Sequence, residues 1–302
     1  MNFNEPDYLD IYLWDVGHGL SITVFTPHVT KGLINRRRII QIDAGSNNET
    51  NFFPIKHLVE NRGVNTIDHL IISHPDLDHI NDLANVKELM DKGKLQVISF
   101  TRNRTIPQSE ISEDAGDECE AKSHYRYLHE NYIHQLQDEH ILTPENFGGL
   151  SAQIVHLDYD PNLDVNDASI IVSLCFGNTQ IIIPGDISDA GVTRMIERDL
   201  MPKPIDNGVR ILIAPHHGRE SAEADNLVSF YKPKIVLASA KTGDEHTDSF
   251  YSNSTDVFGY PIHDQNFENP VSYKFRGTKG QAMHVFIPMG VSPLLRRIPY
   301  DY

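Results

Sequence analysis

Residues 70 to 79 read LIISHPDLDH, and this stretch decides the fold and chemistry expected of the chain. Its first part, 70–73, is an apolar run typical of a buried strand. Histidine or aspartate follows at four of the next six positions, namely His74, Asp76, Asp78 and His79. Burying unpaired carboxylates side by side is costly. Four ligand-type side chains directly after a buried strand therefore indicate a metal site.

Six positions cannot close a metal site, so further ligands are expected from the ends of other strands. Asp186 follows the apolar residues 181–183 and a Pro-Gly turn, and His216 and His217 follow the apolar residues 211–214. Each signal alone is weak, because a Gly-Asp pair is more often a plain turn than a ligand. Their shared placement after apolar runs favours one site built from several strand ends.

Composition limits the class of protein and its partners. The chain has 302 residues, of which 39% are hydrophobic and 23% charged, as in folded globular proteins. No stretch approaches the roughly 18 apolar residues of a membrane span, and the N-terminus lacks signal-peptide features, so we expect a cytoplasmic protein without membrane contact. The net charge of −16 opposes extensive gripping of a duplex. The one dense basic run, Arg36 to Arg38, is expected to be a solvated hairpin edge.

Short strands alternate with helices in both halves of the chain, which predicts an α/β protein with two facing sheets and helices outside, an αββα sandwich. We expect a single domain over residues 1–302. The polar segment 102–147 is predicted to be a helical insertion, either a surface cap or a lid over the site. Residues 80–90 are predicted to form one helix, residues 282–287 a strand of the second sheet, and residues from about 290 a C-terminal tail.

The motifs together resemble the metallo-β-lactamase superfamily. The run from His74 to His79 is similar to its H-x-H-x-D-H signature, with aspartate in place of the second histidine. Other motifs resemble the C-terminal hydrolase domain of the competence protein ComEC, in the same order over about residues 9–250. They are DVGHG at 15–19, IDAG at 42–45, NDAS at 166–169, PGD at 184–186 and PHHG at 215–218. The resemblance implies the metallo-β-lactamase fold and a metal-dependent hydrolase, above all a phosphodiesterase or nuclease.

The resemblance also implies two divalent metal ions, Zn²⁺ or Mn²⁺. Six residues would hold them: His74 and Asp76 on one ion, Asp78, His79 and His217 on the other, and Asp186 between the two. The aspartate at position 76 adds an oxygen ligand, which shifts the preference from zinc towards manganese. Tetrahedral zinc is still compatible with this ligand set.

Catalytic roles follow from the same resemblance. Asp78 and Asp186 would hold the attacking hydroxide between them. His216 and His246 would lie beside the substrate as phosphate contacts or proton donors, a task for a group that titrates near neutral pH. Asp43 would orient the ligand loop through hydrogen bonds.

The sequence departs from the family pattern at three places. Asn81 and Asp82 replace the usual Gly-Gly pair, so the helix start is expected to be more polar or less tightly packed. Leu20 stands where ComEC-type domains carry an acidic residue. The isolated histidine before the Gly-Asp motif has no clear match, and three residues remain open as the missing ligand: His156, Asn166 and Asp167.

The substrate class is carried by the resemblance alone. An acidic surface suits a single-stranded or short nucleic acid, or a cyclic nucleotide, better than a long duplex. A ComEC-like hydrolase without a membrane channel cannot import DNA, which leaves nucleotide signalling or a defence system with a protein partner as its setting. Two alternatives stay open: a small-ester or phosphocholine-type esterase, and a catalytically silent, metal-stabilised binding subunit.

Overall fold

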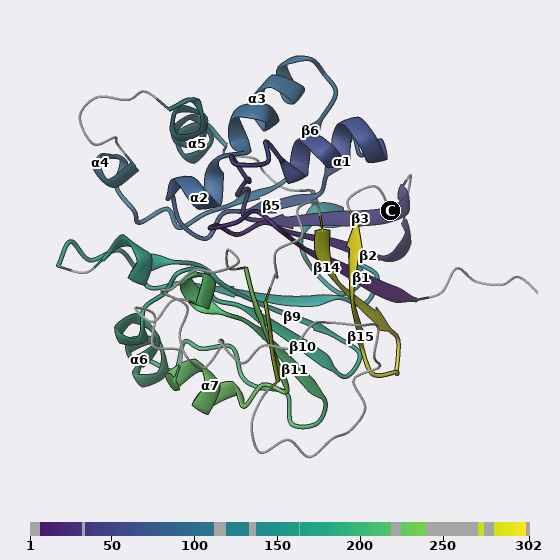
Figure 1. Ribbon diagram of the computed structural model, residues 1–302, viewed down its shortest axis with the longest axis vertical. Coiled ribbons are helices and arrows are strands. Elements are labelled where there is room, and N and C mark those ends of the chain that lie inside the picture. The colour runs from purple at the N-terminus through teal and green to yellow at the C-terminus, as the bar shows by residue number, and fades with distance from the viewer. Residues whose placement is uncertain are drawn as a thin grey trace, which may run out of the picture.

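The computed structural model describes residues 7–31, 34–111, 119–132, 137–162, 164–218, 225–239, 271–274 and 281–299. Two β-sheets lie face to face at the centre, and helices cover their outer faces (Figure 1). This is the αββα sandwich that the sequence predicts, so the predicted fold class is confirmed.

The first sheet has the strand order β15-β14-β1-β2-β3-β5-β7. Its strands are β1 (Tyr8–Trp14), β2 (Ile22–Lys31), β3 (Ile34–Ile42), β5 (His69–Ile71), β7 (Phe100–Thr101), β14 (Gln281–Pro288) and β15 (Leu294–Pro299). β3, β5 and β7 run parallel to one another. The carboxyl ends of these three strands therefore lie at one edge of the sheet.

The second sheet has the strand order β13-β12-β11-β10-β9-β8. Its strands are β8 (Ser151–Val155), β9 (Ile171–Phe176), β10 (Thr179–Ile183), β11 (Val209–Ile213), β12 (Ile235–Ala238) and β13 (Val271–Lys274). β10 to β13 run parallel, and β9 is antiparallel to both of its neighbours. A small third sheet pairs β4 (Thr66–Ile67) with β6 (Gln96–Val97).

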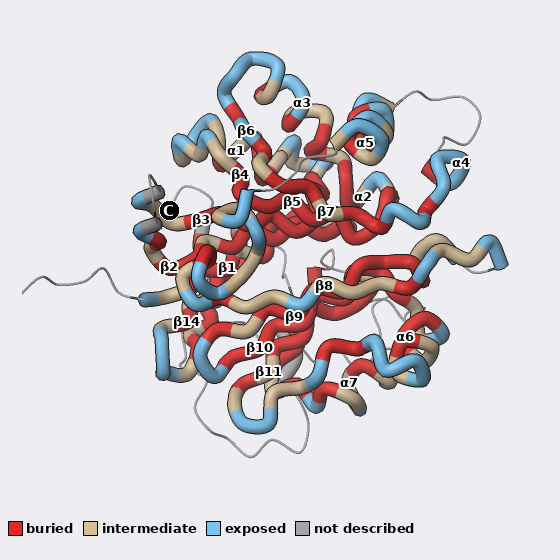
Figure 2. The backbone as a smooth tube through the Cα atoms, turned by 180° about the vertical axis from the view of Figure 1, so that it is seen from behind, coloured by how far each residue is buried: buried red, intermediate tan, exposed pale blue. Residues whose placement is uncertain are grey.

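Helices form the two outer layers (Figures 1 and 2). The first sheet is covered by α1 (Pro54–Arg62), α2 (Leu77–Ile80), α3 (Leu83–Asp91) and α5 (Glu120–Asn131), and the second by α6 (Asp189–Glu197) and α7 (Asp225–Tyr231). Shorter elements are α4 (Gln108–Ile111), η1 (Asp138–His140), η2 (Val165–Ala168) and η3 (Pro215–Gly218). No helix among the described residues is both long and apolar enough to cross a membrane.

Three apolar layers hold the sandwich together. One lies between the sheets and contains Ile40 and Ile42 of β3 with Ile181 and Ile183 of β10. The other two lie between each sheet and its helices. Alternate residues of the central strands thus face different apolar layers, and burial of both faces accounts for their nearly continuous apolar sequence.

Several expectations about single elements were wrong. Helix 80–90 is broken after Ile80, and α3 begins at Leu83. Residues 282–287 belong to β14, which pairs antiparallel with β1 in the first sheet. The apolar pattern predicts a strand but contains no information about its partner, since the pairing is decided by contacts distant in sequence. The segment expected as a tail contains β15, which pairs with β14.

The basic run is not a solvated edge. Arg36 donates two hydrogen bonds to Asp68, at 2.7 and 2.8 Å. Arg37 donates to Asp10 at 2.6 Å, and the side chain of Arg38 has no solvent exposure. The run lies on β3, where the residue before a buried apolar stretch still faces the interior. These arginines are engaged within the fold.

The insertion contributes to the helical layer. Its helix α5 packs against α3 and α2, with Ala121, Tyr125 and Leu128 buried in the layer over the first sheet. Tyr127 on the opposite face is 59% exposed. The described part of the insertion therefore supports α2, the short helix that carries Asp78 and His79.

Candidate metal centre

Both sheets deliver ligand-type side chains to the same edge of the sandwich. His74 follows β5, and Asp78 and His79 lie on α2 directly after it. Asp186 follows β10, and His217 follows β11 on η3. The two ligand regions of the chain, more than 100 residues apart, meet here because the two sheets lie face to face and both present their ligand loops at the same edge of the sandwich.

Four of these side chains converge on one point. The ligand atoms of Asp78, His79, Asp186 and His217 all lie within 4.8 Å of one another. Nε2 of His217 lies 3.1 Å from Oδ2 of Asp78 and 3.4 Å from Oδ2 of Asp186. Nε2 of His79 lies 3.2 Å from Oδ1 of Asp186. Two imidazoles and two carboxylates from both sheets thus share one small volume.

His74 and Asp76 lie on one side of this cluster. Nε2 of His74 is 3.7 Å from Oδ2 of Asp76 and 3.9 Å from Oδ2 of Asp186. The rings of His74 and His79 have centroids 4.1 Å apart. His74 is fully buried, whereas the side chain of Asp76 is 48% exposed, so this side of the site is open to solvent through Asp76.

The charges in the cluster depend on one another. Burial alone lowers the pKa of His79, but the carboxylates of Asp186 and Asp43 outweigh burial and hold that pKa well above its ordinary range. Burial likewise lowers the pKa of His217, and Asp186 and Asp78 reverse the effect and raise it to about 9. Burial raises the pKa of Asp186, and the two histidines hold it well below its ordinary range. Protonated imidazoles compensate the buried carboxylates in this arrangement.

The cluster fits divalent metal ions. Nε2 of His74 is buried and has no hydrogen-bond partner among the described residues. It faces the same carboxylate, Asp186, that lies between His79 and His217. Imidazole nitrogens and carboxylate oxygens are the ligands of zinc and manganese sites. Cations at this point would take the place of the imidazole protons.

Hydrogen bonds behind the cluster orient its histidines. Asp43 accepts from the backbone N–H of Ser73 at 2.6 Å and from its hydroxyl at 2.7 Å. Its Oδ2 atom also lies 2.8 Å from Nδ1 of His79. The hydroxyl of Ser73 is 3.1 Å from Nδ1 of His74. Asp43 therefore lies where the resemblance implies. The contact of Ser73 with both rings was not predicted, because the sequence does not show which groups surround its hydroxyl.

The early glycine motifs pack against the backbone of α2. A Cβ atom at Gly19 would lie 2.4 Å from the carbonyl oxygen of Asp78, and one at Gly45 would lie 2.3 Å from it. The backbone N–H of Leu20 donates to the same carbonyl at 3.2 Å. Leu20 is 3% exposed within the core between the sheets. Leu20, at the position that is acidic in ComEC-type domains, is therefore part of the apolar core of this chain.

Two ligand loops approach each other at Gly185. Its φ is +61°, and a Cβ atom there would lie 2.9 Å from Cβ of Ser73. The carbonyl of Gly185 accepts a hydrogen bond from the backbone of His216 at 3.3 Å. Only glycine combines the left-handed conformation with this close contact, so Gly185 brings the loops of Asp186, His74 and His217 together.

The histidine pair has a strained backbone. His216 and His217 both lie in the left-handed region, at φ 46° and 58°, where residues other than glycine are uncommon. Their rings are nearly perpendicular, at 85°, with centroids 6.1 Å apart. His217 joins the cluster, whereas His216 is half-buried beside it. His246, the other expected substrate contact, lies outside the described residues.

Asp82 has a role that the sequence comparison did not suggest. It is fully buried, and its Oδ2 atom accepts a hydrogen bond from the backbone N–H of Ile55 at 2.5 Å. Phe53, at the N-cap of α1, makes no side-chain capping bond, so Asp82 caps that helix from 27 positions away. Burial raises the pKa of Asp82 to about 7, against the effect of this hydrogen bond. Asp82, which stands at the second position of the family's Gly-Gly pair, therefore caps the N-terminus of α1.

The three residues left open as a further ligand lie in different surroundings. Nδ1 of His156 is 3.0 Å from the carbonyl of Leu157. Asp167 accepts a hydrogen bond from the hydroxyl of Ser188 at the start of α6. The side-chain oxygen of Asn166 is buried without a hydrogen-bond partner among the described residues. The three candidates therefore differ in the contacts that their side chains already make.

Comparison with known proteins gives structural neighbours only. No protein-family model matches the sequence, and no curated protein matches it either. A diphosphatase of the PhnP family aligns with a TM-score of 0.43 and 14% identity, over 93% of this chain and 99% of that protein. A mutant of the β-hydroxylase CmlA aligns with a TM-score of 0.44 and 14% identity, over 77% of this chain and 46% of that protein.

A long form of RNase Z from yeast aligns with a TM-score of 0.36 and 11% identity, over 100% of this chain and 43% of that protein. This chain thus spans less than half the length of the hydroxylase and of the RNase Z. All three TM-scores are below 0.5, so the functional argument rests on the chain's own geometry.

Proposed function

We propose that this protein is a metal-dependent phosphodiesterase or nuclease. The observation that carries the proposal is the convergence of Asp78, His79, Asp186 and His217, from both sheets, to within 4.8 Å. The resemblance of the motifs to the ComEC hydrolase domain supports a phosphodiester as the bond that is cleaved. The net charge of −16 favours a single-stranded or short nucleic acid, or a cyclic nucleotide, over a long duplex.

The proposed ligand set follows the two sides of the cluster. His74 and Asp76 hold one ion, and Asp78, His79 and His217 hold the other. Asp186 lies between them, and its Oδ2 distances of 3.9 Å to His74 and 3.4 Å to His217 support this position. Asn166 is the remaining oxygen ligand that we propose for the His74 side. The many oxygen ligands favour manganese, with zinc as the alternative.

Bound divalent cations supply Lewis acidity, which activates water and stabilises negative charge on the phosphate. The chain contributes the rest. Asp43 and Ser73 orient the histidines, and the fully buried His74 and His79 form a wall closed to solvent. The side chain of Asp78 is 38% exposed, so the substrate approaches from its side. His216 holds a proton for the leaving oxygen, and His246 is the second residue proposed for that step.

The test combines metal content with turnover. Protein prepared with manganese or zinc is analysed for bound metal and assayed on single-stranded DNA, duplex DNA, RNA and cyclic nucleotides. We expect two metal ions per chain and turnover of single strands or cyclic nucleotides. The Asp78→Asn variant should lose about a hundredfold or more of that activity, because it weakens a metal ligand. Asp91→Asn, in an exposed ion pair with Lys87, is the matched control and should retain full activity.

Two outcomes separate the alternatives. Turnover of p-nitrophenyl esters or phosphocholine esters, without any nucleotide cleavage, would replace the proposal with the esterase alternative. Stoichiometric metal that raises the melting temperature without turnover on the whole panel would leave the silent binding subunit. The specific observation that favours the silent subunit is that the group of converging ligand atoms among the described residues consists of Asp78, His79, Asp186 and His217, without His74 or Asp76.

A further inference from the structure

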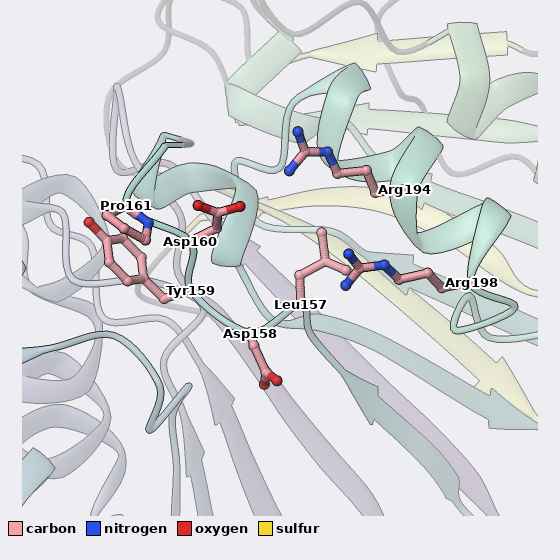
Figure 3. A pocket seen from close by; sticks show the side chains of 7 residues that line it. All are labelled: Leu157, Asp158, Tyr159, Asp160, Pro161, Arg194 and Arg198. Carbon is pink, nitrogen blue, oxygen red and sulfur yellow. The ribbon is translucent and has the colours of Figure 1, made fainter.

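A hollow of about 290 Å³ lies on the flank of the second sheet. The loop of residues 157–161, which follows β8, forms one side, and Arg194 and Arg198 of α6 form the other (Figure 3). Leu157, only 3% exposed, lies between the two arginine side chains and forms the apolar floor (Figure 3). Neither this loop nor α6 belongs to the metal centre described above.

The hollow lies at the same edge of the sheet as the metal centre. β8 and β10 are both antiparallel to β9, so they run in the same direction. The loop with the hollow follows β8 as Asp186 follows β10. The helix α6 begins at Asp189, directly after the turn that carries Asp186, and Arg194 follows about one and a half turns into it. The loop of the hollow and the loop of Asp186 therefore both leave the second sheet at the carboxyl ends of their strands.

The two guanidinium groups have no hydrogen-bonded carboxylate partner within the described part of the chain. Neither Arg194 nor Arg198 makes a side-chain hydrogen bond or ion pair there, although Asp160 shares the hollow. Oδ1 of Asp160 instead accepts from the backbone and side chain of Asn162, at 2.9 and 2.8 Å. These hydrogen bonds, and then the nearby arginines, lower the pKa of Asp160. The carboxylate of Asp158 points away from the arginines (Figure 3).

The spacing of the arginines favours an anion between them. They are four residues apart, Arg194 on α6 and Arg198 at its C-cap, about one helical turn, so their side chains lie on the same face. Like charges at this spacing destabilise a helix, and a bound anion removes that repulsion. Two guanidinium forks are suited to phosphate oxygens, to which they donate paired hydrogen bonds. In a chain whose basic run Arg36 to Arg38 is engaged within the fold, this pair is available for a ligand.

We propose that this hollow is a second phosphate-binding site, which holds a single-stranded nucleic acid at a phosphate remote from the one that is cleaved. Arg194 and Arg198 donate to the phosphate oxygens, and the second carboxylate oxygen of Asp160 accepts from a base N–H. This inference rests on the proposed phosphodiesterase or nuclease function and names its substrate class. The substrate is an oligomer that extends beyond one phosphodiester, rather than a cyclic nucleotide.

The test is a binding measurement that requires no turnover. Fluorescein-labelled oligo-dT is titrated with the Asp78→Asn protein, and anisotropy gives Kd over a range of salt concentrations. Adding Arg194→Ala and Arg198→Ala should weaken binding about tenfold and reduce the slope of log K against log salt by about 0.7 for each lost phosphate contact. The variant with Arg194→Lys and Arg198→Lys keeps both positive charges but loses the two-pronged guanidinium donors. Its Kd should lie between those of the parent and of the double alanine variant.

Lys92→Ala with Lys94→Ala is the matched control, since it also removes two positive charges. Both lysines are exposed and lie between α3 and β6, near the amino ends of the strands, so Kd should stay within about twofold of the parent. Equal weakening in the control and the arginine variant would overturn the proposal, because only net charge would then matter. So would unchanged binding in the arginine variant. If the double variant does not fold, Arg198→Ala alone, at an exposed position, gives the same comparison.

Competition identifies the source of the phosphate. Unlabelled oligo-dT should displace the labelled strand, whereas inorganic phosphate and cyclic AMP should do so only at far higher concentration. Displacement by all three at equal phosphate concentration would make the hollow a small-anion site and overturn the nucleic-acid assignment. Because the binding protein is inactive by design, absence of turnover in the wild type would contradict the proposed function without deciding this test.

Discussion

Nδ1 of His79 lies 2.8 Å from a carboxylate oxygen of Asp43, and neither residue is exposed to solvent. The contact joins the end of β3 to helix α2 and keeps the proton of the imidazole on Nδ1, because a carboxylate only accepts. Nε2 is thereby directed towards Asp186 and His217, and it offers a lone pair to a cation once its own proton is displaced. One buried carboxylate thus sets the ring orientation that the candidate metal centre requires.

Asp43→Asn should weaken metal binding about 10- to 100-fold. The amide can present an N–H to Nδ1 of His79, which favours the opposite tautomer and places a proton on Nε2, where the metal must bind. Asparagine tolerates the left-handed backbone at this position, φ 55°, so the change tests the hydrogen bond rather than the backbone. Competition with a chelating dye measures the affinity. Asp91→Asn is the control, and equal affinities in the two variants would show that Asp43 does not orient the site.

Gly45→Ala should lower the free energy of unfolding by about 1–3 kcal/mol through overpacking. Its added Cβ would lie 2.3 Å from the carbonyl oxygen of Asp78 and 2.7 Å from that of Leu20, both backbone atoms that cannot easily move. Urea denaturation measures the loss. Gly93→Asn is the control, since a Cβ there meets nothing within 4 Å and asparagine tolerates positive φ. Equal losses at the two positions would mean that α2 can shift away from the glycine loop.

The contribution of Asp82 to the free energy of unfolding should decrease as pH rises from about 4 to 7. Its pKa is raised from 3.8 to about 7 by burial, so the folded state holds a proton that the unfolded state has lost. The stabilisation from this group is fully present below pH 3.8 and is lost as pH rises to about 7. At about 1.4 kcal/mol per unit, the loss is on the order of 4 kcal/mol.

Asp82→Asn removes this titration while retaining an oxygen for the N–H of Ile55. We therefore expect the variant to gain stability relative to the wild type as pH rises from 4 to 7, with no further change above pH 8. Chemical denaturation of both proteins at a series of pH values gives the difference curve, in which all other titrating groups cancel. A flat difference curve would show that Asp82 is ionised in the folded protein across this range.

Arg38→Met should leave stability unchanged or raise it by about 1–2 kcal/mol, because an apolar residue removes a poorly compensated buried charge. The three guanidinium nitrogens of Arg38 have no hydrogen-bond partner among the described residues, and the nearest carboxylate oxygen, on Asp68, is 3.7 Å away. Asp68 retains its bonds to Arg36 and Ile39 in the variant. Thermal and urea unfolding measure the effect. A loss above about 1 kcal/mol would show that the charge of Arg38 is needed by its surroundings.

The sequence alone determined the α/β sandwich and most of the site, because both depend on local patterns. His74, Asp186 and His217 each follow an apolar run that is long enough for a buried strand. The position of a strand determines where the residues directly after it lie. The Asp186 and His217 strands could be paired with the first ligand run because parallel strands end at one edge. The order of the motifs along the chain supported the resemblance from which the remaining site residues were inferred.

Only the tertiary structure decided which neighbours these residues have. It assigned β14 to the first sheet, gave Asp82 to the N-terminus of α1, and brought Ser73 between two histidine rings. It engaged the arginines of β3 within the fold and placed Arg194 and Arg198 beside a hollow, where neither has a hydrogen-bonded side-chain partner among the described residues. Such contacts join positions far apart in the chain, and they depend on packing and burial that no local pattern records. The sequence therefore predicted the candidate ligands, and the fold decided which residues lie beside them.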